Sequence, residues 1–243
     1  SKVLLIDAGG SASEEFDTGE SIIAPFLRLR KINHVDYLLV SHPRVDHYGG
    51  MKTIVEDFSP SEFWSGPGEG RTARYRELEE AVRKKGVKRA LLSSRDPCRL
   101  IEGVNVCVLY SPDDRANDSS VVTRLSFGRV SFLFAGDIER KEEEILLQSK
   151  EDTSSHVLKV PRHGSLSSST EEFIAAVKPK LAVFSVGHRN PFGLPREEVI
   201  SRYQAAGSEI FSTDEDGAIV VETDGERFLY WTYRRERRGT LSP

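Results

Sequence analysis

The chain contains 243 residues, of which 38% are hydrophobic and 30% are charged, and its formal net charge is −4 at pH 7. This composition is typical of a globular protein, and the length suits one α/β domain with a substantial core. No apolar run approaches the roughly 18–20 residues that span a bilayer, and the mild acidity gives no broad basic footprint for nonspecific binding of nucleic acid.

The spacing of apolar residues predicts strands that alternate with helices and also form hairpins. The first residues already fit a strand, so no signal peptide is expected. Strands are expected at residues 3–6, 35–40, 63–65, 89–93, 104–110, 120–127, 130–134, 157–160 and 181–186, and as a hairpin over 219–231. Helices are expected at residues 21–30, 51–58, 72–85, 141–148, 170–177 and 195–206. This order predicts mixed sheets with helices outside, followed by a basic, frayed segment at residues 234–238.

Residues 41–50 carry the clearest chemical signal. Their sequence, Ser-His-Pro-Arg-Val-Asp-His-Tyr-Gly-Gly, places His42, Asp46 and His47 on the loop between a predicted strand and a predicted helix. Imidazole and carboxylate groups are ligands of zinc and similar divalent metals. The pattern therefore predicts a metal site, against the alternative of a solvated turn that holds its histidines by chance.

Two later strand ends carry related residues. Asp137 follows the strand at 130–134 in the sequence Ala-Gly-Asp, and His163 follows the strand at 157–160 in Pro-Arg-His-Gly-Ser. Taken alone, the aspartate is also explained as a turn former, and the histidine as a loop or capping residue.

The pattern Ser-His-x-x-x-Asp-His-x-Gly-Gly resembles the metal-binding loop of the metallo-β-lactamase superfamily. Residues 158–165, 184–187 and 213–219 narrow the resemblance to the C-terminal metallo-β-lactamase-like domain of ComEC-type competence proteins, a family of DNA-uptake channels. The resemblance implies an αββα sandwich, in which two mixed sheets are flanked by helices and the site lies at one edge between them. It also implies that residues 1–243 form a single domain, which can be an excised part of a larger membrane protein.

The resemblance further implies the ligands of one or two divalent ions, zinc or manganese. These ligands are His42, Asp46, His47, Asp137 and His163. One metal would use His42, position 44 and a third ligand near Asn117 or Asp118. The other would use Asp46, His47 and His163, with Asp137 shared.

Three positions depart from the pattern of that group. Arg44 stands where an aspartate or histidine is expected, Arg162 where the first histidine of a His-His-Gly-Ser run is usual, and Leu194 where a histidine is usual. Arginine stays protonated and cannot coordinate a metal. The first metal site has therefore lost a ligand, which predicts a weakened or mononuclear centre.

The preferred hypothesis is a metal-dependent phosphodiesterase or nuclease that acts on single-stranded or double-stranded DNA during uptake. Asp46 and Asp137 would act at the metal, and Arg44 and Arg162 would clamp a phosphate. The alternative is a catalytically impaired DNA-binding or docking domain in which Arg44 replaces a metal. Hydrolysis of a small thioester or lactam is allowed by the superfamily but favoured by nothing specific.

The same resemblance sets the expected partners and location. In a full-length parent protein the partner would be a membrane channel domain, and no nucleotide cofactor is expected. The location would be the extracytoplasmic face of a bacterial membrane for a ComEC-type protein, and the cytoplasm otherwise.

The chain contains two cysteines, Cys98 and Cys107. If Glu102 and Gly103 form a two-residue hairpin turn, the cysteines lie opposite each other across the ladder. A disulfide is then conceivable, and two buried free thiols are the equal alternative. A bond would argue for an extracytoplasmic location.

Overall fold

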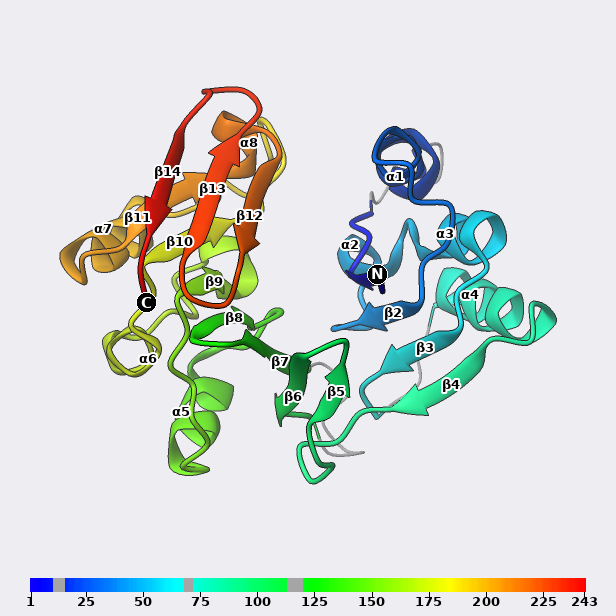
Figure 1. Cartoon of the computed structure of the whole chain (residues 1–243), viewed down its shortest axis with the longest axis horizontal. Coiled ribbons are helices and arrows are strands. Elements are labelled where there is room, and N and C mark those ends of the chain that lie inside the picture. The colour runs from blue at the N-terminus through cyan, green and yellow to red at the C-terminus, as the bar shows by residue number, and fades with distance from the viewer. Residues whose placement is uncertain (11–15, 68–71, 113–119) are drawn as a thin grey trace. The chain divides into compact units, whose positions relative to one another are not determined.

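The computed structural model describes residues 1–10, 16–67, 72–112 and 120–243 (Figure 1). Asn117 and Asp118, which were expected near a third metal ligand, lie outside the described residues. The chain divides into two compact units. Unit 1 comprises Ser1–Asp96 and Ser111–Val121, and unit 2 comprises Pro97–Tyr110 and Val122–Pro243.

Unit 1 contains a four-stranded parallel sheet in the order β1-β2-β3-β4. Its strands are β1 (Leu4–Ile6), β2 (Tyr37–Val40), β3 (Glu62–Ser65) and β4 (Lys88–Leu91). Its helices are η1 (Gly19–Ile23), α1 (Ala24–Leu29), α2 (Val45–Tyr48), α3 (Met51–Phe58) and α4 (Ala73–Lys84). Because parallel strands all point the same way, the residues that follow β1 and β2 meet at one edge of the sheet.

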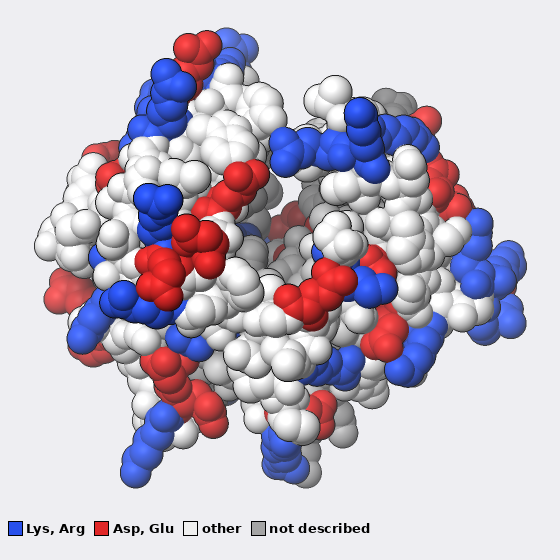
Figure 2. All heavy atoms as spheres, in the orientation of Figure 1, with Lys and Arg blue, Asp and Glu red and all other residues white. Residues whose placement is uncertain are grey.

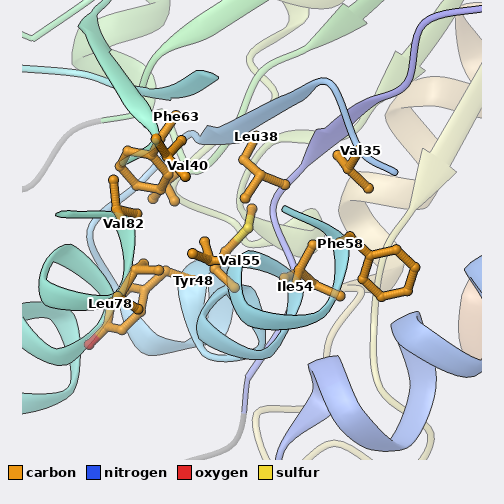
Figure 3. Packing of buried hydrophobic residues seen from close by; sticks show 14 of the residues in the cluster. Val35, Leu38, Val40, Tyr48, Ile54, Val55, Phe58, Phe63, Leu78 and Val82 are labelled. Atoms are coloured by element: carbon orange, nitrogen blue, oxygen red, sulfur yellow. The ribbon is translucent and has the colours of Figure 1, made fainter. Parts of the chain in front are cut away.

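The core of unit 1 lies between this sheet and its helices (Figure 3). Alternate residues of β2 point to opposite faces, and Leu38 and Val40 join the core beneath α3 and α4. Helix α3 buries four residues at helical spacing, Met51, Ile54, Val55 and Phe58. This packing fixes the β2 strand end and the segment that leads from it into α3.

Unit 2 contains a seven-stranded mixed sheet in the order β11-β10-β9-β8-β7-β6-β5 and a three-stranded antiparallel sheet in the order β12-β13-β14. The first sheet consists of β5 (Arg99–Ile101), β6 (Val104–Tyr110), β7 (Val122–Phe127), β8 (Val130–Phe134), β9 (Val157–Lys159), β10 (Leu181–Phe184) and β11 (Glu209–Ser212). The second consists of β12 (Ile219–Thr223), β13 (Phe228–Thr232) and β14 (Arg238–Leu241). The helices are α5 (Arg140–Gln148), η2 (Pro161–Gly164), α6 (Glu171–Val177), α7 (Glu197–Ala205) and α8 (Thr213–Asp216).

The large sheet of unit 2 is covered on both faces. Helices α5, α6 and α7 pack on one face through Leu146, Phe173 and Val199. The three-stranded sheet covers the other face, where Phe228 and Tyr230 join a second apolar cluster (Figure 1). Sheets flanked by helices confirm the predicted mixed α/β class.

The expected hairpin over residues 219–231 is confirmed as β12 and β13. The expectation that residues 234–238 fray is wrong, because the backbone there is hydrogen-bonded. The Thr232 amide donates to the Arg237 carbonyl, and the Arg234 amide donates to the Asp216 carbonyl. The chain then returns as β14, which pairs with β13.

The two cysteines form a disulfide, so the bonded alternative is the one observed. Ile101 pairs with Val104, which leaves Glu102 and Gly103 as the two-residue turn of the β5–β6 hairpin. Both turn residues have positive φ, of 46° and 87°, and a glycine at the second position relieves the strain of such a turn.

Within the described ranges, no helix has the length and apolar character needed to cross a bilayer.

Candidate metal centre

In unit 1, the candidate ligands lie where β1 and β2 end. Asp7 follows β1, Ser41 and His42 follow β2, and Asp46 and His47 lie on the short helix α2. The Asp7 amide donates to the Leu39 carbonyl, which extends the pairing of the strands to this edge. The parallel sheet therefore gathers these polar side chains from different parts of the sequence.

Glycines allow α2 to approach the loop after β1 closely. A Cβ atom on Gly10 would lie 1.8 Å from the Val45 carbonyl oxygen, and one on Gly49 would lie 2.7 Å from the Gly10 Cα. Gly49 and Gly50 have φ values of −56° and −91°, which any residue adopts. Close backbone contact, rather than a special turn, explains the glycines here.

His47 is buried and is held in one orientation by Asp7. Its Nδ1 lies 2.8 Å from Asp7 Oδ2, and Asp7 also accepts hydrogen bonds from the Ser41 amide and hydroxyl at 2.8 and 2.6 Å. Burial by itself would raise the pKa of the Asp7 carboxyl, but the His47 ring and the Ser41 hydrogen bonds outweigh burial and hold that pKa below its ordinary value. An ionised carboxylate only accepts, so His47 Nδ1 carries a proton and donates it to Asp7.

Asp46 and His42 lie beside this ring. Asp46 Oδ2 is 4.0 Å from His47 Nε2. The His42 and His47 rings meet edge to face with centroids 5.3 Å apart, and His42 is 2% exposed. Unit 1 thus brings the predicted ligands His42, Asp46 and His47 together.

Arg44 lies next to the same group. Its Nε is 3.5 Å from Asp46 Oδ1, and both side chains are partly exposed, at 46% and 36%. The guanidinium therefore places positive charge beside one of the proposed ligands.

In unit 2, Asp137 and His163 follow the neighbouring parallel strands β8 and β9. Their side chains approach each other, with Asp137 Oδ1 3.5 Å from His163 Nε2. His163 Nδ1 lies 2.7 Å from the Ser185 carbonyl oxygen. A carbonyl only accepts, so Nδ1 donates, and Nε2 is the ring nitrogen that faces the carboxylate.

The backbone that carries His163 has an unusual conformation. Arg162 and His163 both have positive φ, of 46° and 55°, a region that costs energy for residues with a Cβ atom. Gly164 follows with φ 82°, and a Cβ atom there would lie 2.7 Å from the Phe184 ring. The turn is therefore held in place by tight packing against β10.

Arg162 makes an ion pair within this unit. Its Nη1 lies 2.5 Å from Glu139 Oε1, and the Ser167 hydroxyl also donates to that carboxylate at 3.1 Å. The guanidinium proposed as a phosphate clamp is thus engaged by a neighbouring acid.

A family model described as the metallo-beta-lactamase superfamily matches residues 1–188. The chain belongs to the metallo-β-lactamase superfamily. Members of this superfamily are metal-dependent hydrolases. The assignment confirms the family resemblance predicted from residues 41–50.

Curated relatives confirm the narrower resemblance to ComEC-type competence proteins. The chain is 28% identical to ComE operon protein 3 of Bacillus subtilis over 89% of its length, and 31% identical to competence protein ComA of Neisseria gonorrhoeae, also over 89%. It is 29% identical to the uncharacterized protein YcaI of Escherichia coli over 97% of its length. The chain spans only 28–29% of the length of these relatives.

Two solved structures share the fold of this superfamily member. The metallo-beta-lactamase fold protein YhfI from Bacillus subtilis matches with a TM-score of 0.52 and 11% identity, over 86% of this chain and 83% of that one. The E377D mutant of CmlA beta-hydroxylase matches with a TM-score of 0.50 and 14% identity, over 74% of this chain and 43% of that one. At these identities the likeness concerns the fold alone.

The donors of this metallo-β-lactamase superfamily chain fit a divalent cation. Each unit supplies a carboxylate and an imidazole whose Nε2 faces that carboxylate, at 4.0 Å in unit 1 and 3.5 Å in unit 2. In protein metal sites, the other ring nitrogen of a coordinating histidine is usually tied to a carboxylate or carbonyl, as Nδ1 is in both rings here. Mixed carboxylate and imidazole donors suit zinc or manganese.

Sequence reasoning missed Asp7 and Glu139. Asp7 ends the first strand, and the same strand-end argument that selected Asp137 would have selected it, once β1 was placed beside β2. Glu139 carries no such signal, because it is the N-cap residue before α5 and its importance depends on a contact with Arg162.

Proposed function

We propose that this chain is a metal-dependent phosphodiesterase that acts on DNA. One divalent cation, zinc or manganese, would be held by Asp46 and His47 of unit 1 and by Asp137 and His163 of unit 2. The observation that carries the proposal is an arrangement that both histidines share. In each ring Nδ1 is hydrogen-bonded to an acceptor, Asp7 for His47 and the Ser185 carbonyl for His163. A histidine kept only for packing does not require a fixed Nδ1 together with an Nε2 that faces a carboxylate, and both rings show this arrangement.

Such a cation, when bound, lowers the pKa of a water molecule and withdraws charge from a phosphoryl oxygen. The protein supplies orientation around it. Asp7 holds the proton of His47 at Nδ1, and the Ser185 carbonyl does the same for His163. Nε2 is then the ring nitrogen that each histidine would present to a metal.

The arginines contribute unequally in this proposal. Arg44 is half exposed, and its Nε lies 3.5 Å from Asp46 Oδ1. Because this contact is long, the guanidinium group can still hydrogen-bond to a phosphate. Arg162 is held at 2.5 Å by Glu139 and must exchange that partner to reach a substrate. Because Arg44 also occupies a position expected for a ligand, the centre proposed here is mononuclear.

A second candidate is a DNA-binding or docking domain that has lost the chemistry. The contact between Arg44 and Asp46 favours it, since a guanidinium can neutralise a carboxylate in place of a metal.

The relatives and the disulfide support a larger parent protein and an extracytoplasmic location for either candidate function. Competence protein ComA is named for competence, and the relatives are more than three times as long as this chain, which agrees with a channel domain elsewhere in a parent protein. The bond between Cys98 and Cys107 favours an extracytoplasmic location, because cytosolic thiols are kept reduced.

A cleavage assay tests the proposal. Labelled single-stranded and double-stranded DNA is incubated with the protein and manganese or zinc, with and without EDTA. We expect cleavage that requires metal, and loss of cleavage in His47→Ala and His163→Ala. His34→Ala is the matched control, because this exposed histidine contacts Ser61 and Asp36 instead. Metal-loaded protein that leaves both substrates intact would contradict the nuclease proposal and favour the docking candidate.

A further inference from the structure

The three-stranded sheet at the end of the chain has a second face that no core cluster uses. Side chains alternate along β13, so Phe228, Tyr230 and Thr232 are buried while Leu229 is 44% exposed and Trp231 is partly exposed. Of these, Phe228 and Tyr230 pack against the seven-stranded sheet. The outer face therefore presents a leucine and a tryptophan to the surroundings.

The register of β14 adds a basic and a hydroxyl side chain to this face. Trp231 pairs with Arg238, and Leu229 pairs with Thr240, so the side chains of each pair are neighbours on one face. A groove of about 750 Å³ runs along these strands, lined by Leu229, Trp231, Glu236, Arg238 and Thr240 among others. In Figure 2, basic side chains with acidic ones among them gather at the upper left, where β13 ends and β14 begins (Figure 1).

The arginines of the β13–β14 connection differ in what they contact. Arg234 donates to the Asp214 carbonyl at 2.8 Å, and Arg235 pairs with Glu215 at 2.8 Å. Arg237 stacks 3.9 Å above the Phe211 ring and lies 3.6 Å from Asp216. By contrast, the Arg238 side chain makes no hydrogen bond or ion pair with any residue that the structure describes. Of these four arginines, Arg238 is therefore the one whose guanidinium can bind a ligand without giving up a contact.

We propose that this groove binds single-stranded nucleic acid. A base would stack on Trp231, and Arg238 would contact the adjoining phosphate, the combination by which sequence-tolerant single-strand binders work. A duplex keeps its base faces stacked inside and cannot use Trp231 in this way. The choice of ligand rests on the proposed action on DNA, but the groove itself requires no metal.

Glu236 should have the opposite effect to Arg238 on the binding of a phosphate. This acidic residue lines the same groove as Arg238, so it repels a phosphate that approaches there. Removing its charge should tighten binding, whereas removing the charge of Arg238 should weaken it.

Tryptophan fluorescence provides the readout. The chain has two tryptophans; Trp64 is 1% exposed and lies in unit 1, so it serves as a constant background to Trp231. Oligo(dT) is titrated into the full chain in EDTA, with binding followed in parallel by anisotropy of a labelled strand. We expect quenching of the Trp231 emission in wild type, and quenching that disappears in Trp231→Phe while most of the affinity remains.

The variants separate stacking from charge. Trp231→Ala should weaken binding by roughly tenfold or more. Arg238→Gln should weaken binding and lower the salt slope by about 0.7, and Glu236→Gln should strengthen it. Arg30→Gln, at an exposed arginine of unit 1, is the matched control and should leave affinity unchanged. Circular dichroism checks that each variant is folded.

Three outcomes would overturn the proposal. In the first, oligo(dT) does not bind. In the second, it binds without quenching tryptophan emission, and Trp231→Ala binds it as tightly as wild type. In the third, Trp231→Ala changes the oligomeric state, which would make the face a contact between copies. Because EDTA is present throughout, none of these outcomes bears on metal-dependent cleavage, and a failure to cleave DNA would not alter this result.

Discussion

His47 and His163 are oriented by chemically different acceptors, and in both rings the acceptor binds Nδ1. An aspartate accepts from Nδ1 of the first, and a backbone carbonyl accepts from Nδ1 of the second. A carboxylate also raises the basicity of the ring it contacts, which a carbonyl does more weakly. His47 should therefore be the stronger donor, and its aspartate should matter for metal affinity.

Replacing that aspartate gives a direct prediction. In Asp7→Asn, the amide can donate to Nδ1 and shift the proton to Nε2, which removes the lone pair that a metal needs. We expect affinity for zinc or manganese to fall about 10- to 100-fold while the fold is retained, as measured by competition with a chelating dye. Asp57→Asn, at a surface ion pair with Arg28, is the control. Unchanged affinity in Asp7→Asn would show that Asp7 has no part in the site.

Arg44 supplies a second prediction at this scale. Arg44→Asp removes the cation beside Asp46 and restores a carboxylate at the position where the family pattern has a ligand. We expect metal affinity to rise by about tenfold, or about 1.4 kcal/mol, in a calorimetric titration. Arg44→Gln separates the two effects, since it removes the charge without adding a ligand. If Arg44→Asp binds metal no better than wild type, Arg44 is not what weakens the site.

The strand ends were predictable because apolar runs followed by polar residues mark them in the sequence. That pattern located His42, Asp46, His47, Asp137 and His163, and the structure places each at a strand end or on the short helix that follows one. The pairing of Arg162 with Glu139 was not predictable, because it depends on where α5 begins relative to η2.

At the scale of elements, Asp36 ties the start of β1 to β2. Its carboxylate accepts hydrogen bonds from the Lys2 ammonium at 2.7 Å and the Val3 amide at 2.9 Å. Burial alone would raise the pKa of Asp36, but these contacts outweigh burial and hold the pKa below its ordinary value. Asp36 therefore stabilises the fold above the unfolded-state pKa of about 4, and this contribution is lost as the pH falls through the folded-state pKa.

Asp36→Asn tests this pH dependence. The variant should be less stable than wild type at about pH 7, and the difference should shrink as the pH falls below about 4. Urea unfolding across this range measures it. A difference that stays constant down to about pH 3 would mean that the charge of Asp36 contributes nothing.

The disulfide makes a prediction for the β5–β6 hairpin. It closes a loop between residues 9 positions apart, for which loop-closure entropy gives a stabilisation of about 2.5 kcal/mol. The double variant Cys98→Ser, Cys107→Ser should lose about this much unfolding free energy, and a reducing agent should produce the same loss in wild type. A reduced wild type as stable as the oxidised form would contradict the estimate.

Strand β14 is an element that the spacing of apolar residues did not predict. The segment Tyr-Arg-Arg-Glu-Arg before it shows no apolar alternation, so nothing in the sequence suggested a strand. Pairing with β13, together with Arg237 stacked on Phe211, orders it instead. Tertiary contacts of this kind are not encoded in local spacing.

At the scale of the molecule, the four ligands of the proposed metal centre come in equal number from the two units. Asp46 and His47 belong to unit 1, whereas Asp137 and His163 belong to unit 2. A cation bound by both pairs would stabilise the native chain by its binding free energy, because the unfolded chain does not hold these donors together. Metal binding and thermal stability should therefore rise together.

The most direct test is the metal content of wild type and of one ligand variant from each unit. Each protein is loaded with manganese or zinc, dialysed, and measured by mass spectrometry, with His34→Ala as control. We expect about one ion per chain in wild type and in His34→Ala, and loss of that ion in both His47→Ala and His163→Ala. A wild type that holds no metal, or an ion that survives loss of the histidine from one unit, would contradict a centre built from both.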